Sequence, residues 1–123
     1  IGLNPSTATE LKHDPTVTRL IGFAKTWGFG SATVLNLFAY RATLPSDMKK
    51  ISEPVGKEND FWMKKEIDLA NKLVAAWGNH GKFLNRSQEV LKFINEFYHF
   101  VFTKQGEPRH VLYLSNEVEL KKF

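Results

Sequence analysis

The amino-acid sequence predicts an α/β domain: a three-layer, doubly wound arrangement around a short, mainly parallel four-stranded sheet. Short apolar segments alternate with longer segments whose apolar residues recur at helical spacing. The short segments are apolar throughout rather than at every second position, which is typical of parallel strands that helices cover on both faces. The 123 residues fit one domain, residues 1–123.

The first predicted strand is represented only by its end. Residues 1–3 are apolar and precede a stretch with the composition of a turn at residues 4–7. The chain does not begin with Met. We therefore expect residues 1–3 to be the last part of a central strand, and the domain to lack its natural N-terminal residues.

The next predicted element is a helix with signals at both ends. Apolar residues recur at intervals of three and four between residues 17 and 27. Asp14 is suited to cap the helix, Pro15 to be its first residue, and Gly28 to end it in a left-handed conformation.

The middle of the chain predicts a second strand, a long loop and a second helix. Residues 32–37 form a short β-rich run that leads into a loop. Residues 43–58 contain Pro45, Pro54 and Gly56 and are expected to be irregular, either a functional lid or a connector. Residues 59–70 have one broad apolar face and predict a helix.

The last third of the chain again alternates predicted strands with a predicted helix. Residues 73–77 predict a third strand, which the glycine-containing stretch 78–81 ends. Ser87 is suited to cap a helix whose apolar residues continue to Phe97. Residues 98–102 predict a fourth strand, followed by a turn at residues 104–108 and a segment at residues 109–115.

Composition excludes some classes of function. The chain has no cysteine, which excludes thiol chemistry and disulfides and favours a cytoplasmic location. No apolar run approaches the length of a membrane span, so we expect no membrane partner. The formal net charge of +4 suits a nucleic acid, but the lysines of residues 64–72 stand beside acidic residues and fit a solvated face better.

Polar residues follow each predicted strand. Those at the four strand ends are Asn4, Asn36, Asn79 with His80, and Arg109 with His110. Each has an ordinary structural explanation, such as satisfying a turn. Because the carboxyl ends of parallel strands share one edge, their coincidence instead favours a common cleft.

The residue types in this group suit a planar, hydrogen-bonding ligand. An asparagine amide matches the edge of a nucleobase, and a histidine can stabilise developing negative charge. Phe38 or Tyr40 would offer a ring for stacking, and Arg41 a charge. Five basic residues are expected to form a rim around this cleft, namely Arg41, Lys82, Arg86, Lys104 and Arg109. We expect no metal and no cofactor, since neither clustered carboxylates nor a glycine-rich phosphate loop is present.

Several motifs identify a family. The chain resembles a bacterial and phage family, domain of unknown function sixteen-forty-three, through the motifs Leu-Asn-Pro-Ser-Thr-Ala and Pro-Arg-His-x-Leu-Tyr-Leu. The resembling stretches are residues 2–8, 14–16, 28–30, 36–43, 77–81 and 108–114. At Val111 the family more often has proline.

A more distant similarity is to the uracil-DNA glycosylase superfamily, whose ordered motifs resemble residues 2–5, 34–36, 76–78 and 110–115. This resemblance implies a glycosylase-like fold. It also implies that Asn4 orients a water, that Asn36 reads the base and that His110 stabilises the departing base anion. Leu112 or Tyr113 would be the wedge that replaces a flipped base.

These observations lead to one functional expectation and two alternatives. We expect nucleobase recognition, with hydrolysis of an N-glycosidic bond in DNA or a nucleotide as the reaction. The catalytic residues would be Asn4 and His110. The substrate-binding residues would be Asn36, Phe38, Tyr40, Arg41, Asn79, His80 and Arg109. The alternatives are a non-catalytic nucleic-acid-binding module and a small-molecule nucleoside enzyme.

Overall fold

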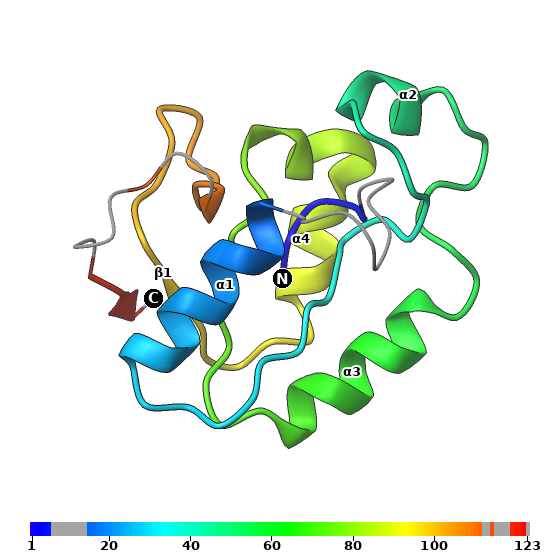
Figure 1. Ribbon diagram of the computed structural model, residues 1–123. Helices are drawn as coiled ribbons and strands as arrows, with labels where there is room; N and C mark the ends of the chain where they lie inside the picture. Colours follow the sequence, from blue (N-terminus) through cyan, green and yellow to red (C-terminus); the bar gives the residue numbers. More distant parts are fainter. Residues whose placement is uncertain (6–14, 112–113, 115–118, 123) are drawn as a thin grey trace.

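Helices form most of the regular structure. The computed structural model describes residues 1–5, 15–111, 114 and 119–122 (Figure 1). Its elements are α1 (Pro15–Thr26), α2 (Pro45–Lys49), α3 (Asn59–Leu69), the 3₁₀ helix η1 (Asn79–Asn85), α4 (Arg86–Leu91), β1 (Tyr98–His99) and β2 (Lys121–Lys122). None of the helices in these ranges combines the length and apolar character needed to cross a bilayer.

The predicted fold class is wrong. Within the described residues the regular sheet has two antiparallel strands, β1 and β2, with Tyr98 opposite Lys122. The predicted strands meet only in isolated parallel bridges, Gly2 with Asn36 and Val74 with Tyr98. A ladder needs several consecutive paired residues, whereas each of these contacts is a single bridge. The described residues therefore do not form the four-stranded parallel sheet of a three-layer, glycosylase-like domain.

Residues 1–3 nevertheless lie between two other segments. On one side, Gly2 N–H donates to the Leu35 carbonyl at 2.8 Å, and Leu37 N–H donates to the Gly2 carbonyl at 3.0 Å. On the other side, Ala76 N–H donates to the Ile1 carbonyl at 2.8 Å. The three segments run in the same direction, so their carboxyl ends lie together.

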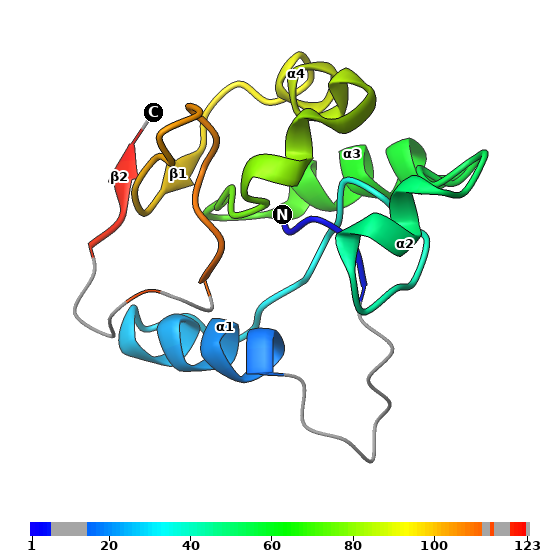
Figure 2. The ribbon, with the colours of Figure 1, turned by 90° about the horizontal axis from the view of Figure 1, so that it is seen from above.

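These paired segments separate two hydrophobic cores. In Figure 2, α1 lies on one side of residues 1–3, and α3 and α4 lie on the other. The core on the α1 side contains Phe23, Ala76, Phe100 and Val111. The larger core on the opposite side is built from residues such as Leu3, Leu37, Phe38, Met63, Ala75 and Trp77.

Two of the predicted helices are confirmed. The first is α1, and Gly28 ends it with a φ of 81°; Asp14, its predicted cap, lies outside the described residues. The second is α3, which ends one residue before Ala70. The predicted loop at residues 43–58 contains the short helix α2.

The helix predicted to start at Ser87 differs at both ends. It begins at Arg86 and ends at Leu91, and no side-chain hydrogen bond caps it. The buried Ser87 hydroxyl donates instead to Glu107 Oε1 at 3.0 Å. A contact with a residue distant in sequence thus takes the place of the local cap.

Glu107 is the centre of a buried polar group. Its other carboxylate oxygen, Oε2, accepts a hydrogen bond of 2.6 Å from the Trp77 indole N–H. The Trp77 ring also packs tightly against Gly81, where a β-carbon would lie 2.2 Å from Cδ1 of the indole. These contacts fix the chain on either side of residue 78 and the chain that leads to residue 110.

Arg86 joins α4 to two other parts of the larger core. It is 1% exposed, and its Nε donates to the Leu37 carbonyl at 2.7 Å. Its two terminal nitrogens contact Glu89 at 2.7 Å and Asp60 of α3 at 2.5 Å. The buried guanidinium is therefore fully paired, as a charge in a core requires.

Candidate functional site

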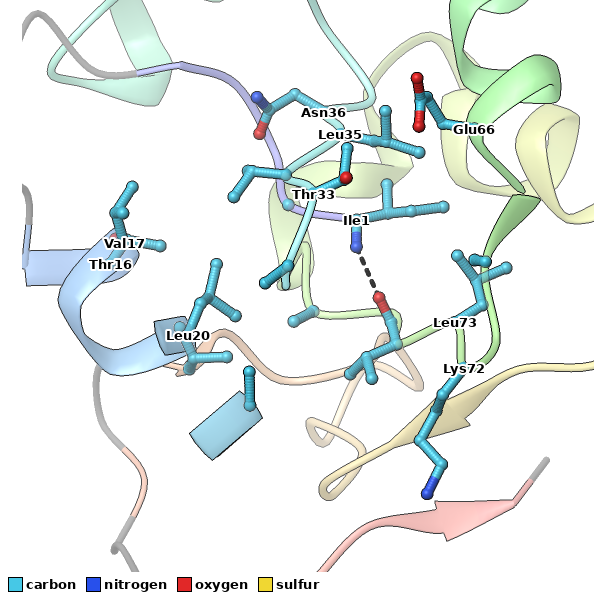
Figure 3. Close-up of a pocket in the computed structure, with 18 of the residues that line it drawn as sticks. Ile1, Thr16, Val17, Leu20, Thr33, Leu35, Asn36, Glu66, Lys72 and Leu73 are labelled. Atoms are coloured by element: carbon cyan, nitrogen blue, oxygen red, sulfur yellow. Dashed lines mark hydrogen bonds between the residues drawn. The ribbon is translucent and has the colours of Figure 1, made fainter. Parts of the chain in front are cut away.

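A cavity of about 630 Å³ separates α1 from the paired segments. Figure 3 shows Thr16, Val17 and Leu20 of α1 on one side, with Thr33 and Asn36 across the opening. The predicted site residues that line this cavity are Asn4, Asn36, Arg41 and His110. The structure therefore brings four of the nine together, from three separate parts of the chain.

The cavity has two ends, and the predicted polar residues gather at one of them, which is called the polar end. Asn4 and Asn36 lie at the carboxyl ends of the parallel segments, together with Gly78 and the neighbouring His110. The amino ends of the same segments form the other end of the cavity, where residues 31–34 and 69–74 line it. The candidate site is the polar end.

The Asn4 side chain is fixed by the hydrogen bonds that its amide nitrogen donates. Its Nδ2 donates to the carbonyls of Ala42 at 3.0 Å, Pro5 at 3.2 Å and Tyr40 at 3.4 Å. Two of these acceptors flank Arg41, so this amide fixes the backbone that carries the arginine. Among the described residues nothing donates to Asn4 Oδ1, and this oxygen is an available acceptor.

Asn36 presents its side chain to the cavity. Its amide has no hydrogen-bond partner within the described ranges, and its Oδ1 packs against Gly2, 3.0 Å from where a β-carbon would stand. The backbone is fixed separately, because Asn59 Nδ2 donates to the carbonyls of Asn36 at 3.0 Å and Leu37 at 3.1 Å. A rigid backbone thus carries an amide that a ligand can use.

His110 reaches the cavity from the last described loop. It is half-buried, and the Gly78 N–H donates to the Pro108 carbonyl at 2.8 Å two residues earlier. Gly78 has a φ of 74°, and a β-carbon there would lie 3.8 Å from the β-carbon of His110. The left-handed turn after Trp77 therefore packs directly beside this histidine.

The predicted aromatic residues do not line the cavity. Phe38 is fully buried and packs against Phe83 with ring centroids 5.8 Å apart. Tyr40 is 41% exposed, and its carbonyl is one of the three acceptors of the Asn4 amide. Neither ring is placed to stack on a ligand at the polar end.

Three predicted polar residues also lie elsewhere. Asn79 Oδ1 accepts a hydrogen bond from the Thr103 hydroxyl, which serves the turn before Glu107. His80 Nδ1 lies 2.9 Å from Lys49 Nζ. Arg109 is exposed and is not among the residues that line the cavity.

The basic rim is incomplete. Of its five predicted members, Arg41 lines the cavity and Arg86 is buried in the core with its charge paired. Lysines 82 and 104 are exposed but do not line the cavity. Arg86 can be buried because the carboxylates of Asp60 and Glu89 pair with its charge. The positions of basic residues in the sequence do not reveal these partners.

One titratable group near α2 has a shifted pKa. Partial burial lowers the pKa of His80 below its ordinary value of 6.5, and the ammonium of Lys49 lowers it further. A neutral ring is thereby favoured, and its Nδ1 can accept a hydrogen bond from Lys49.

Two polar residues that line the cavity from helices are absent from the predicted site. Thr16 lines the cavity from α1, one helical turn before Leu20, and this shared face is the sequence signal for it. Glu66 lines the cavity from α3. Its position beside two lysines makes it resemble any surface acid, so the sequence carries no distinguishing signal.

The comparisons with known proteins give a family. Residues 1–112 match a family described as "Protein of unknown function (DUF1643)", and the chain belongs to it. No curated protein and no solved structure matches the chain. The family resemblance is therefore confirmed, whereas the similarity to the uracil-DNA glycosylase superfamily has no support from these comparisons. In the part of the chain that the structure describes, no three histidine or acidic side chains gather as a metal site would require.

Proposed function

We propose that the polar end of the cavity binds a nucleobase, carried by a nucleic acid or a nucleotide. The Asn36 amide is the observation that carries this proposal, because it lines the cavity without a hydrogen-bond partner among the described residues. A planar amide offers two donors and one acceptor, which match the edge of a base. Arg41 supplies a cation at the same end, suited to a phosphate.

The proposed recognition uses the edge of the base. Phe38 is buried and Tyr40 lies off the cavity, so no predicted ring supports stacking. The Asn36 backbone is fixed by Asn59, which restricts the directions in which the amide can bind. Preorganisation of this kind favours selection by hydrogen-bond pattern. A cytoplasmic location, which the cysteine-free composition favours, fits a nucleotide or nucleic-acid ligand.

Calorimetric titration with the common nucleoside monophosphates and with short single-stranded oligonucleotides tests this proposal. Asn36→Ala should weaken binding about tenfold or more, since a two-point base contact contributes about 1–3 kcal/mol. Asn71→Ala is the matched control, because Asn71 lines the opposite end of the same cavity. Equal losses in both variants, or no loss in Asn36→Ala, would contradict base recognition at the polar end.

The same titration distinguishes the two carriers of the base. A nucleic acid should bind more weakly as salt rises, and neutralising Arg41 should reduce the log–log salt slope by about one. If the ligand is instead a free nucleotide or nucleoside, the protein should bind that small molecule and show no measurable affinity for oligonucleotides. The first result supports a nucleic-acid-binding module, and the second supports a small-molecule site.

Hydrolysis of the N-glycosidic bond is a second candidate, favoured by His110 and Asn4 on the same cavity. Asn4 Oδ1 would accept a hydrogen bond from a water whose oxygen bonds to the sugar carbon. The carbon–nitrogen bond then breaks with its electron pair on the base, and a His110 N–H would stabilise that anion. The proton that the water loses reaches the base through solvent.

Incubation with oligonucleotides that carry modified and deaminated bases tests hydrolysis, with abasic sites as the readout. Asn4→Ala and His110→Ala should each abolish turnover while base binding persists. Asn36→Ala should lose binding and turnover together. No abasic site at any base would reject hydrolysis and leave the binding proposal standing.

A further inference from the structure

Two large aromatic side chains are exposed near the start of α3, which lies along the lower edge of the molecule in Figure 1. Phe61 is 64% exposed and Trp62 is 49% exposed. Their ring centroids lie 5.2 Å apart and their planes meet at 82°, so the two rings support each other in an edge-to-face pair. Neither residue lines the cavity. The ring pair is therefore a surface feature separate from the polar end.

Two lysines of the same helix lie over aromatic rings. The Lys65 ammonium lies 5.1 Å from the centroid of the Trp62 ring, and the Lys64 ammonium lies 5.0 Å from that of Phe93. On a helix both lysines are close enough to reach Asp68, three and four residues further along. Neither forms that ion pair within the described residues. The two ammonium groups therefore stay available to an anion beside the rings.

The charge around the ring pair is positive. Asp60 directly precedes Phe61, but its carboxylate contacts the buried guanidinium of Arg86 at 2.5 Å and is neutralised by it. Glu66 lines the cavity on another side of the helix. Within four residues of the ring pair, the exposed charged residues are Lys57, Glu58, Lys64 and Lys65. An anionic partner is therefore favoured.

Rings and ammonium groups in this arrangement are typical of a surface that binds nucleic acid. A base stacks on an aromatic ring, and a lysine beside the ring binds a phosphate of the same strand. A helix that lies on a membrane presents one continuous apolar face, whereas charged residues separate Trp62 from Leu69 on α3. The core of a protein–protein interface is depleted of charge, whereas the Lys65 ammonium lies over the Trp62 ring itself.

We infer that the ring pair and the two lysines beside it form a surface that binds a single strand of nucleic acid. This strand-binding surface consists of Phe61, Trp62, Lys64 and Lys65. The start of α3 lies against the polar end, since Asn59 Nδ2 donates to the Asn36 carbonyl at 3.0 Å. The inference rests on the nucleic-acid form of the proposed function, because the strand whose base enters the polar end would continue over α3. A single strand is required, since its unpaired bases offer their faces to the rings.

Tryptophan fluorescence tests this surface, with a mixed-sequence single-stranded oligonucleotide of about twelve nucleotides as the probe. The oligonucleotide should quench the emission of the natural chain. Trp62→Phe should remove most of this quenching and keep most of the affinity, because phenylalanine still stacks on a base. The exposure of Trp62 makes it the expected reporter, whereas Trp77 is 1% exposed.

A double variant measures what the rings contribute to affinity. Phe61→Ala combined with Trp62→Ala should weaken oligonucleotide binding about tenfold or more. The same variant should bind a nucleoside monophosphate as the natural chain does, because neither ring lines the cavity. Leu44→Ala is the matched control, since Leu44 is 56% exposed and lies outside this helix.

The lysines are tested through the salt dependence of binding. Lys64→Ala combined with Lys65→Ala should reduce the log–log salt slope for the oligonucleotide by about one or more. Lys25→Ala, at an exposed position in the last turn of α1, should leave the slope unchanged.

Equal oligonucleotide affinity in the double ring variant and in Leu44→Ala would overturn the inference. Quenching by vesicles of phosphatidylserine and phosphatidylcholine, with none by the oligonucleotide, would overturn it as well and indicate a membrane surface. Failure of the proposed function is distinguishable from both results. In that case Asn36→Ala leaves mononucleotide and oligonucleotide binding unchanged, whatever the double ring variant does.

Discussion

Gly2 and Asn36 are in contact through a position that only glycine leaves open. A β-carbon on Gly2 would lie 3.0 Å from the amide oxygen of Asn36, which is tighter than ordinary packing. The same two residues form an isolated parallel bridge through their backbones. The direction of the Asn36 amide therefore depends on the absence of a side chain at residue 2.

Gly2→Ala should displace the Asn36 amide and weaken base binding. The methyl group is expected to cost about 1–2 kcal/mol of stability, as other overpacking substitutions do. Calorimetric titration and urea unfolding measure the two effects. Gly22→Ala is the control, since nothing described lies within 4 Å of its added β-carbon, and alanine suits the middle of a helix. Unchanged binding in Gly2→Ala would show that the amide direction is not set by this contact.

Removal of the Glu107 carboxylate should destabilise the domain. Glu107→Ala leaves the Trp77 indole N–H and the Ser87 hydroxyl without their buried acceptor. Hydrogen bonds to a charged group contribute about 1.5–3 kcal/mol each, so a loss of about 3 kcal/mol is expected in urea unfolding. Glu53→Ala, at an exposed position, should change stability by less than about 0.5 kcal/mol. Similar values for the two variants would contradict a structural role for this carboxylate.

Replacement of Arg86 should have a still larger effect. Arg86→Met removes the contacts to Asp60, Glu89 and the Leu37 carbonyl at once, and breaking a buried ion pair costs about 3–5 kcal/mol. Lys50→Ala is the comparison, because its ion pair with Asp47 is exposed and contributes about 0–1 kcal/mol. Chemical unfolding of both variants decides the matter. A methionine variant as stable as the natural chain would mean that desolvation of the guanidinium offsets its contacts.

Stability should fall as the solution becomes acidic below about pH 6.5. Burial, and then Lys49, lower the pKa of His80; burial, and then Lys121, lower the pKa of His99. The unfolded chain therefore binds more protons than the folded chain just below pH 6.5, and protonation favours unfolding. The stabilising contribution is complete above the ordinary pKa of 6.5 and is lost as the pH falls through the lower folded values.

Urea unfolding between pH 7.5 and 5.0 measures this dependence. His80→Asn should flatten the curve in part, and His80→Asn combined with His99→Asn should flatten it more. An identical slope in the natural chain and the double variant would assign the pH dependence to other groups.

The helices are the part of the fold that the sequence predicts well, because their signals are local. Pro15 and Gly28 mark the two ends of α1, and both lie within a few residues of the apolar residues that predict the helix. The prediction that Ser87 caps a helix is wrong because its hydroxyl donates to Glu107, twenty residues away. The prediction of a parallel sheet is wrong because an apolar run indicates only that a segment is buried. A ladder requires consecutive residues to pair with a distant segment. The pairing of β1 with β2 depends on such a distant partner as well.

The candidate site was predictable to the extent that it depends on chain direction. Asn4 and Asn36 line the same cavity because parallel neighbours bring their carboxyl ends together, even over a single bridge. Phe38 follows Asn36 by two residues, yet it is fully buried in the larger core because the chain turns there toward residue 55. The position of a residue near the end of a predicted strand therefore indicates the region of the site. Tertiary packing decides which side chains in that region reach the cavity.

The fit between Gly81 and the Trp77 ring has an evolutionary consequence. Since a β-carbon at residue 81 would overlap the indole, relatives that keep tryptophan at residue 77 should keep glycine four positions later. Relatives with a smaller residue at 77 should accept alanine or serine at 81. The two positions are thus expected to change together during divergence, which would make them a linked pair in any set of homologous sequences.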